Sequence, residues 1–113
     1  MSYIESVDIR QGTKSTPRYS NGNTLPLTQL PFGMASFVPQ TNGGNGNWFY
    51  YPEDRCLEGV RLTHQPSPWI GDYGTFVFQP QMGTPCLNAN QRWSGYRPEQ
   101  AVLRPDYLSF DFL

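Results

Sequence analysis

Glycine and proline interrupt this chain so often that long helices are excluded. The 113 residues contain 11 glycines and 11 prolines. No window of about a dozen residues keeps the 3.6-residue apolar period of an amphipathic helix without interruption. Between these residues lie short apolar runs of the length that β-strands have. We therefore predict an all-β chain with helix as a minor component at most.

Six short runs are predicted strands, and turn-forming residues separate them. They are Met34 to Pro39, Trp48 to Tyr51, Gly59 to Thr63, Gly74 to Gln79, Ala101 to Arg104 and Tyr107 to Leu113. This spacing predicts an antiparallel β-sandwich, similar to a supersandwich. The last run still alternates apolar and polar residues at Leu113, so we expect an incomplete sandwich that belongs to a larger protein. Its exposed strand edge would then favour self-association of the isolated fragment.

Charge and cysteine content exclude several classes of function. The 8 Lys and Arg residues balance 9 Asp and Glu residues, and the cations are scattered, so no nucleic-acid surface is indicated. The sequence holds neither a secretion signal nor a membrane-spanning run, which predicts a cytoplasmic protein without membrane contact. Cys56 and Cys86 lie far apart and outside any C-x-x-C pair, so no zinc site is indicated, and we expect two unpaired thiols, with a single disulfide as the alternative.

The segment from Thr63 to Gly74 combines polar and aromatic side chains with turn formers. Its two prolines, in Pro66-Ser67-Pro68, predict a rigid loop that presents His64, Trp69 and Asp72. Binding sites are often built on such loops. Two interpretations of His64 stay open: a ring that bridges two loops, or a hydrogen-bonding group in a polar pocket.

A second tryptophan extends the predicted binding surface. Trp48 follows the glycine-rich loop Gln40 to Asn47, and it either caps the core, which is the default, or lies over a ligand. An indole ring stacks on the apolar face of a sugar, while amide and carboxylate groups bind the hydroxyls. The set Trp48, His64, Gln65, Trp69 and Asp72 therefore fits a carbohydrate.

Catalytic machinery is not evident in these residues. No G-x-S-x-G sequence supports a serine nucleophile, and the single histidine has no partner for a metal site. Glu53 and Asp54 lie beside Pro52 in a polar turn and are expected to be solvated. Glu58 and Asp72 give no clearer catalytic signal. The glycine-rich loop lacks the Gly-Lys-Ser/Thr sequence of a phosphate-binding loop. We therefore assign no catalytic residue and no metal ligand to this chain.

Several motifs occur in an order that is similar to a known enzyme family. They are Val7-Asp8-Ile9-Arg10-Gln11-Gly12-Thr13, Ser20-Asn21-Gly22-Asn23-Thr24-Leu25-Pro26, Leu30-Pro31-Phe32-Gly33-Met34, Val38-Pro39-Gln40-Thr41, Trp48-Phe49, and Gly59 to Tyr73. Together they resemble the N-terminal domain of glycoside hydrolase family 92, the calcium-dependent exo-α-mannosidases. The His-Gln-Pro-Ser-Pro-Trp sequence that begins at His64 looks like the family branch without secretion signals.

The resemblance implies a two-domain enzyme. Residues 1–113 would be the first part of its N-terminal β-sandwich, and a C-terminal (α/α)6 barrel, absent here, would be its partner domain. The barrel would carry the catalytic glutamate and aspartate and most calcium ligands. Family members invert at the anomeric carbon and remove terminal mannose from glycans, here with an α-1,2-mannosidase-like preference.

In this chain, Trp48, His64, Gln65, Trp69 and Asp72 would line the mannose subsite. The isolated 113 residues would be inactive. The alternative is a non-catalytic carbohydrate-binding or structural β-sandwich module.

Overall fold

The computed structural model describes residues 2–14, 18, 24–41, 50–64, 76–88 and 90–113. Within these ranges there are seven strands and two short 3-10 turns, η1 (Tyr3–Ser6) and η2 (Pro98–Gln100), and no α-helix. Every strand pair is antiparallel. The predicted all-β antiparallel fold is thus confirmed.

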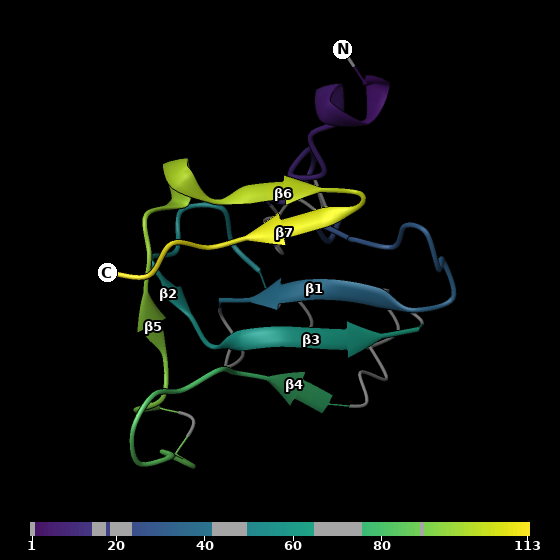
Figure 1. Ribbon diagram of the computed structural model, residues 1–113. Coiled ribbons are helices and arrows are strands. Elements are labelled where there is room, and N and C mark those ends of the chain that lie inside the picture. Colours follow the sequence, from purple (N-terminus) through teal and green to yellow (C-terminus); the bar gives the residue numbers. More distant parts are fainter. Residues whose placement is uncertain (1, 15–17, 19–23, 42–49, 65–75, 89) are drawn as a thin grey trace.

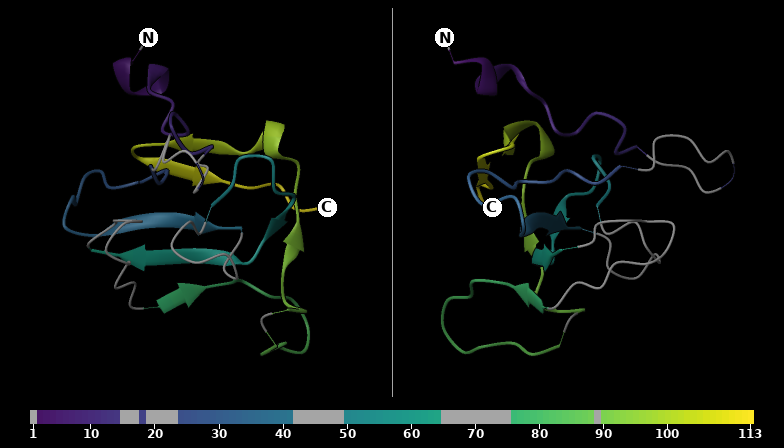
Figure 2. Two further views of the ribbon diagram at one scale, coloured as in Figure 1. Left: turned by 180° about the vertical axis from the view of Figure 1, so that it is seen from behind. Right: turned by 90° about the vertical axis from the view of Figure 1, so that its right-hand side faces the viewer.

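The strands form three small sheets (Figure 1). The largest contains β1 (Ser36–Gln40), β3 (Gly59–Thr63) and β4 (Phe76–Phe78), in the order β1-β3-β4. β2 (Cys56–Leu57) pairs with β5 (Ser94–Gly95), and β6 (Val102–Arg104) forms a hairpin with β7 (Tyr107–Ser109). From behind, the β6–β7 hairpin again lies above the β1-β3-β4 sheet (Figure 2).

Most predicted strands are present, with shifted ends. The strand Gly59–Thr63 has the predicted bounds, and β1, β4 and β6 overlap their predicted runs. The last run ends as a strand at Ser109, after which Phe112 forms only an isolated bridge with Tyr96. Tyr50 and Tyr51 are not in a strand, which corrects the described half of the run predicted from Trp48 to Tyr51.

The main core lies between the β2–β5 pair and the β6–β7 hairpin. Its buried members are Tyr50, Leu57, Tyr96, Ala101 and Leu103, and partly buried Ile9, Leu108 and Phe110 pack against it. The Tyr96 and Phe110 rings meet edge to face, with their centroids 5.1 Å apart. Leu108 and Phe110, which lie two positions apart in the last run, therefore both pack against the core, as the period of two predicts.

The β1-β3-β4 sheet has little core of its own. Val38, on β1, is completely buried and packs with Leu25 and Leu27 in a small second cluster. The chain before β1 crosses from this sheet to the hairpin, because Thr28 pairs with Phe37 while the Gln29 amide donates to the Pro105 carbonyl oxygen at 2.9 Å. These bonds fix the sheet relative to the β6–β7 hairpin.

The two faces of this sheet are unlike each other. Strand register places one set of side chains on one face, which we call the apolar face: Phe37, Pro39, Val60, Leu62, Phe76 and Phe78. The other face, which we call the polar face, carries Ser36, Val38, Gln40, Arg61, Thr63 and Val77. On the polar face, Ser36, Gln40 and Thr63 are buried together with the apolar Val38. On the apolar face Pro39 is buried, whereas all three phenylalanines are exposed.

Two further findings concern the cysteines and membrane contact. Cys56 and Cys86 are both free and half-buried, so the prediction of unpaired thiols is confirmed. No helix in the described ranges has the length and apolar character needed to cross a bilayer.

Candidate functional site

The polar face carries a hydrogen-bonded network at the end of β1. The Gln40 amide nitrogen donates to Glu58 Oε2 at 2.9 Å, and Gln40 Oε1 accepts from Arg61 Nε and Nη2 at 3.0 and 2.6 Å. The Glu58 backbone amide donates to the Gln40 carbonyl oxygen at 2.8 Å. Because Gln40 is buried and uses both ends of its amide, it fixes a carboxylate and a guanidinium side by side.

Next to this network, Thr41 joins the parts of the chain on either side of segment 42–49. The Tyr51 amide donates to Thr41 Oγ1 at 2.9 Å, and Thr41 Oγ1 donates to Asp54 Oδ2 at 2.8 Å. The Asp54 amide in turn donates to the Tyr51 carbonyl oxygen at 3.2 Å. These bonds hold Thr41 and Tyr51, which flank segment 42–49, close to each other. The attachment of this segment is therefore a fixed feature of the fold.

Asp54 is half-buried, which corrects its predicted solvation. Burial raises the pKa of its carboxyl, while the hydrogen bond from Thr41 acts in the opposite direction and nearby Glu58 adds to the increase. Glu53, by contrast, is exposed as predicted and pairs with Lys14. Asp54 is thus a structural acceptor beside segment 42–49, and it differs from its neighbour because Thr41 lies over it.

The tyrosines of the adjacent core are protonated at neutral pH. Burial raises the pKa of Tyr50 to about 12 and also raises the pKa of Tyr96. The Tyr96 hydroxyl is buried without a hydrogen-bond partner among the described residues. Neither phenol therefore acts as a base near pH 7.

The opposite end of the polar face leads to His64. Thr63, the last residue of β3, is buried and pairs with Ser36, whose hydroxyl accepts from the Gln29 amide nitrogen at 2.5 Å. His64 follows and is exposed, and its ring makes no hydrogen bond with any residue that the structure describes. Both interpretations of His64 stay open, since residues 65–75, which follow it, lie outside the described residues.

The structure leaves most of the predicted site untested. Trp48, Gln65, Trp69 and Asp72 lie outside the described residues. What the described parts show is where their loops attach. Segment 42–49 leaves β1 at Gln40, which pairs with Gly59, whereas segment 65–75 leaves β3 at Thr63, which pairs with Ser36. The two attachment points thus lie at opposite ends of β3, about 13 Å apart for four steps of roughly 3.3 Å.

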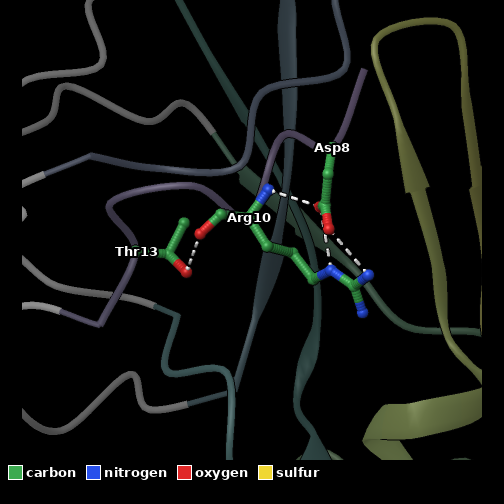
Figure 3. A network of polar contacts seen from close by, with 3 residues as sticks. All are labelled: Asp8, Arg10 and Thr13. Carbon is green, nitrogen blue, oxygen red and sulfur yellow. Dashed lines mark hydrogen bonds and ion pairs between the residues drawn. The ribbon is translucent and has the colours of Figure 1, made fainter. Parts of the chain in front are cut away.

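A second polar arrangement organises the N-terminal motif (Figure 3). Arg10 donates from Nε and Nη2 to the two Asp8 oxygens, each at 2.9 Å, and its backbone amide also donates to Asp8 Oδ1 at 2.9 Å. The Arg10 side chain holds the pKa of Asp8 below its usual range. Thr13 Oγ1 donates to the Arg10 carbonyl oxygen at 2.7 Å. Since Asp8 and Arg10 satisfy one another, this pair stabilises a turn rather than offering free charges to a ligand.

The chemistry of the polar face suits the recognition of hydroxyl groups. Amide, guanidinium and carboxylate side chains are held in fixed orientations, with loops of polar and aromatic sequence attached at both ends. In the described ranges, no three His, Cys, Asp or Glu side chains gather into a group that could hold a metal ion. Sequence reasoning did not single out Gln40, Thr41 or Arg61, although all three lie within the quoted motifs, because polar residues in a predicted strand resemble a solvent-facing row.

We expect Thr41→Val to destabilise the protein more at pH 7 than at pH 4. The valine leaves both Asp54 Oδ2 and the Tyr51 amide without their partner, at a cost of about 1–3 kcal/mol. In the wild type, the hydrogen bond from Thr41 favours ionised Asp54. Without it, the pKa of Asp54 in the folded variant rises further above its unfolded value. The variant therefore loses more stability than the wild type as pH rises through that pKa. Urea unfolding at the two pH values measures the difference.

Thr13→Val is the matched control for this experiment. Thr13 is buried, as Thr41 is, but its hydroxyl donates to a backbone carbonyl that does not titrate. Its cost should be equal at both pH values. Equal costs at both pH values for Thr41→Val as well would contradict the assigned role of Asp54.

Comparisons with known proteins show that nearly the whole chain is similar to one family. A family model described as the glycosyl hydrolase family 92 N-terminal domain matches residues 6–112. Among solved structures, the chain is similar to an inverting mannosidase of family GH92 from Bacteroides thetaiotaomicron, with 36% identity and a TM-score of 0.83. That match covers 99% of this chain and 16% of the mannosidase chain. No curated protein matches.

Proposed function

We propose that this chain, which belongs to glycosyl hydrolase family 92, forms a substrate-binding part of the N-terminal domain of an inverting exo-α-mannosidase. The observation that carries the proposal is the similarity to a solved inverting mannosidase along 99% of the chain. Because the chain spans only 16% of that mannosidase, the activity is proposed for a longer protein.

In this proposal, this chain binds the substrate and the second domain catalyses its hydrolysis. Residues 1–113 form the first part of a β-sandwich, and an (α/α)6 barrel supplies the general acid and the general base. An inverting pair of carboxyl groups lies roughly 6.5–9.5 Å apart, so that a water molecule fits between the base and the sugar. This chain would orient the terminal mannose of a glycan, of α-1,2-linked type, through Trp48, His64, Gln65, Trp69 and Asp72.

The described residues support this role through the loop attachments. The Thr41 and Asp54 hydrogen bonds fix the chain on either side of segment 42–49, which contains Trp48. The pairing of Ser36 with Thr63 fixes the strand end from which His64 and Trp69 follow. Such preorganisation lowers the entropy that a site loses when it binds a sugar. The cytoplasmic location and the α-1,2 preference remain predictions.

Calcium belongs to the proposal for the longer protein. The described part of this chain offers no group of three candidate ligands, so no step of the mechanism passes through a metal ion here. We propose that the second domain holds the ion, where calcium would bind sugar hydroxyls. We do not propose His64, which is exposed, as a ligand of this ion.

Aryl α-mannosides and mannobiosides test the proposal. The full-length protein should release mannose, lose activity in EDTA and regain it with added calcium, whereas residues 1–113 alone should give no turnover above blank. Calcium-dependent hydrolysis by the 113 residues would contradict the placement of catalysis in the second domain. Sugar binding without hydrolysis by the full-length protein would instead favour a non-catalytic module.

A further inference from the structure

The segment that joins β4 to β5, at the lower left in Figure 1, forms a pocket together with Ser94 of β5 and Phe112. Its volume is about 360 Å³, within the range of roughly 300–1,000 Å³ that small-molecule sites occupy. Its polar lining includes Thr84, Gln91 and Arg92. None of the described lining residues belongs to β1 or β3, so the pocket is distinct from the polar face.

Arg92 in this pocket has no acceptor for its guanidinium among the described residues. The residue is half-buried, and its Nε atom is fully covered without a hydrogen-bond partner. The other half-buried arginines of the described ranges do have acceptors. Arg61 donates to Gln40 Oε1 at 2.6 Å, and Arg104 pairs with Asp106 at 3.2 Å. Because a guanidinium keeps its charge at every accessible pH, partial removal from water without an acceptor costs free energy.

The other lining residues select the charge of the partner that Arg92 lacks. No Asp or Glu is among the described lining residues, whereas Thr84 and Ser94 offer hydroxyls and Gln91 offers an amide. Neutral donors beside one positive charge favour an anion over a cation. Carboxylate and phosphate groups match the planar fork of a guanidinium, which can donate two parallel hydrogen bonds to them.

The pocket also has the room and the apolar surface for more than a bare ion. Pro80 and Phe112 supply apolar walls. Phe112 is 45% exposed and is held by its bridge with Tyr96. An aromatic ring of this kind packs against the apolar C–H face of a sugar. We infer that this pocket binds an acidic sugar, with its carboxylate or phosphate on Arg92 and its ring against Phe112.

Hydrogen bonds within the segment hold the pocket in shape. Gln81 Oε1 accepts from the Cys86 amide at 2.6 Å, and Gln81 Nε2 donates to the Cys86 carbonyl oxygen at 3.0 Å. The Asn88 carbonyl oxygen accepts from both the Gln91 and the Arg92 amides, at 3.0 and 3.1 Å. A site whose backbone is fixed before binding loses less entropy when the ligand arrives.

Calorimetric titration of the full-length protein tests the inference. Glucose 6-phosphate and glucuronate carry the two kinds of oxyanion, glucose carries none, and inorganic phosphate has no ring. At least one acidic sugar should bind roughly 10-fold or more tightly than glucose, because charge-assisted hydrogen bonds are the strong ones. It should also bind more tightly than inorganic phosphate. The tighter of the two acidic sugars identifies the oxyanion.

Two results of this titration would overturn the inference. One is an affinity for both acidic sugars no higher than that for glucose, which would contradict the charge. The other is an equal affinity for inorganic phosphate, which would contradict the sugar. Because none of these probes is a mannoside, a failed mannosidase assay leaves the outcome unchanged.

Substitution of Arg92 locates the binding. Arg92→Gln should lower the affinity for the acidic sugar at least roughly 10-fold, while Arg92→Lys, which keeps the charge but loses the fork, should retain part of it. Arg97→Gln is the matched control, because Arg97 is exposed and does not line the pocket. Its affinity should equal that of the wild type. Equal affinities for Arg92→Gln and Arg97→Gln would contradict the role of Arg92.

Phenylglyoxal labelling gives a readout that needs no substitution. This reagent modifies accessible arginines, and mass spectrometry identifies the modified residue. With the acidic sugar at about ten times its Kd, Arg92 should be modified about 10-fold more slowly, because only about one protein in eleven stays unoccupied. Arg97 should react at an unchanged rate. An unchanged rate at Arg92 would overturn the inference, even where Arg92→Gln fails to fold.

Discussion

Gly59→Ala is expected to destabilise the protein by about 3–5 kcal/mol, more than most single substitutions do, or to prevent folding. Gly59 begins β3 with φ +143°, a conformation that residues with a side chain rarely adopt. An added Cβ would lie 2.6 Å from the Phe78 carbonyl oxygen and 2.5 Å from Val77 Cγ1. Because one of these atoms is backbone in the neighbouring strand, the pairing of β3 with β4 has to shift.

Two other glycines provide a graded control. Gly33 has nothing within 4 Å of its Cβ position and no positive φ, so Gly33→Ala should change stability by less than about 0.5 kcal/mol. Gly83 has φ +77° but open space, so Gly83→Ala should cost about 1–2 kcal/mol. Urea unfolding of the three variants gives the ranking. A Gly59→Ala midpoint equal to that of Gly33→Ala would contradict the close approach of β4.

The effect of Gly59→Ala should reach the candidate site. Gly59 pairs with Gln40 and follows Glu58, so a displaced β3 separates the members of the network that Gln40 holds. Activity loss in this variant should therefore accompany its instability. Melting curves distinguish this indirect loss from the loss of a sugar contact.

Replacing the tryptophan that contacts mannose should cost the full-length enzyme most of its activity. One of the two variants, Trp48→Ala or Trp69→Ala, removes the side chain that stacks on the mannose ring. For that variant we expect kcat/KM to fall by roughly 30- to 1000-fold, because a lost contact of about 2–4 kcal/mol corresponds to that factor. The corresponding phenylalanine variant should recover part of the activity because it keeps an aromatic face. Steady-state kinetics with an aryl α-mannoside measures both.

Trp93→Ala is the control for the tryptophan variants. Trp93 is half-exposed and lies directly before β5, outside segments 42–49 and 65–75, which contain Trp48 and Trp69. Its replacement should leave kcat/KM within about twofold of wild type, as for a surface substitution. Wild-type kinetics for both Trp48→Ala and Trp69→Ala would contradict the assignment of a tryptophan to the mannose subsite.

The sequence predicted the fold class and the bounds of β3, one of the two longest described strands, because these depend on local signals. Frequent glycine and proline interrupt any long helix, and the run Gly59 to Thr63 has enough apolar residues to define its bounds. The strands Cys56–Leu57 and Ser94–Gly95 were not predicted, since two residues carry no period. Their pairing depends on contacts between distant segments.

The candidate site was less predictable than the fold. Alternation along β1 and β3 separates polar from apolar residues, but it cannot tell which face other elements will cover. The default that apolar residues point inward fails here: Gln40 is buried, and Phe37 is exposed. Likewise, the half-buried state of Asp54 depends on Thr41, which precedes it by thirteen positions. The predicted residues Trp48, Gln65, Trp69 and Asp72 stay predictions.

The stereochemistry of hydrolysis tests the central claim most directly. Proton NMR of the full-length protein acting on an aryl α-mannoside resolves the anomer of mannose that forms first, before mutarotation mixes the two. An inverting exo-α-mannosidase should release β-mannose first. Release of α-mannose first, or no release of mannose in the presence of calcium, would contradict the account.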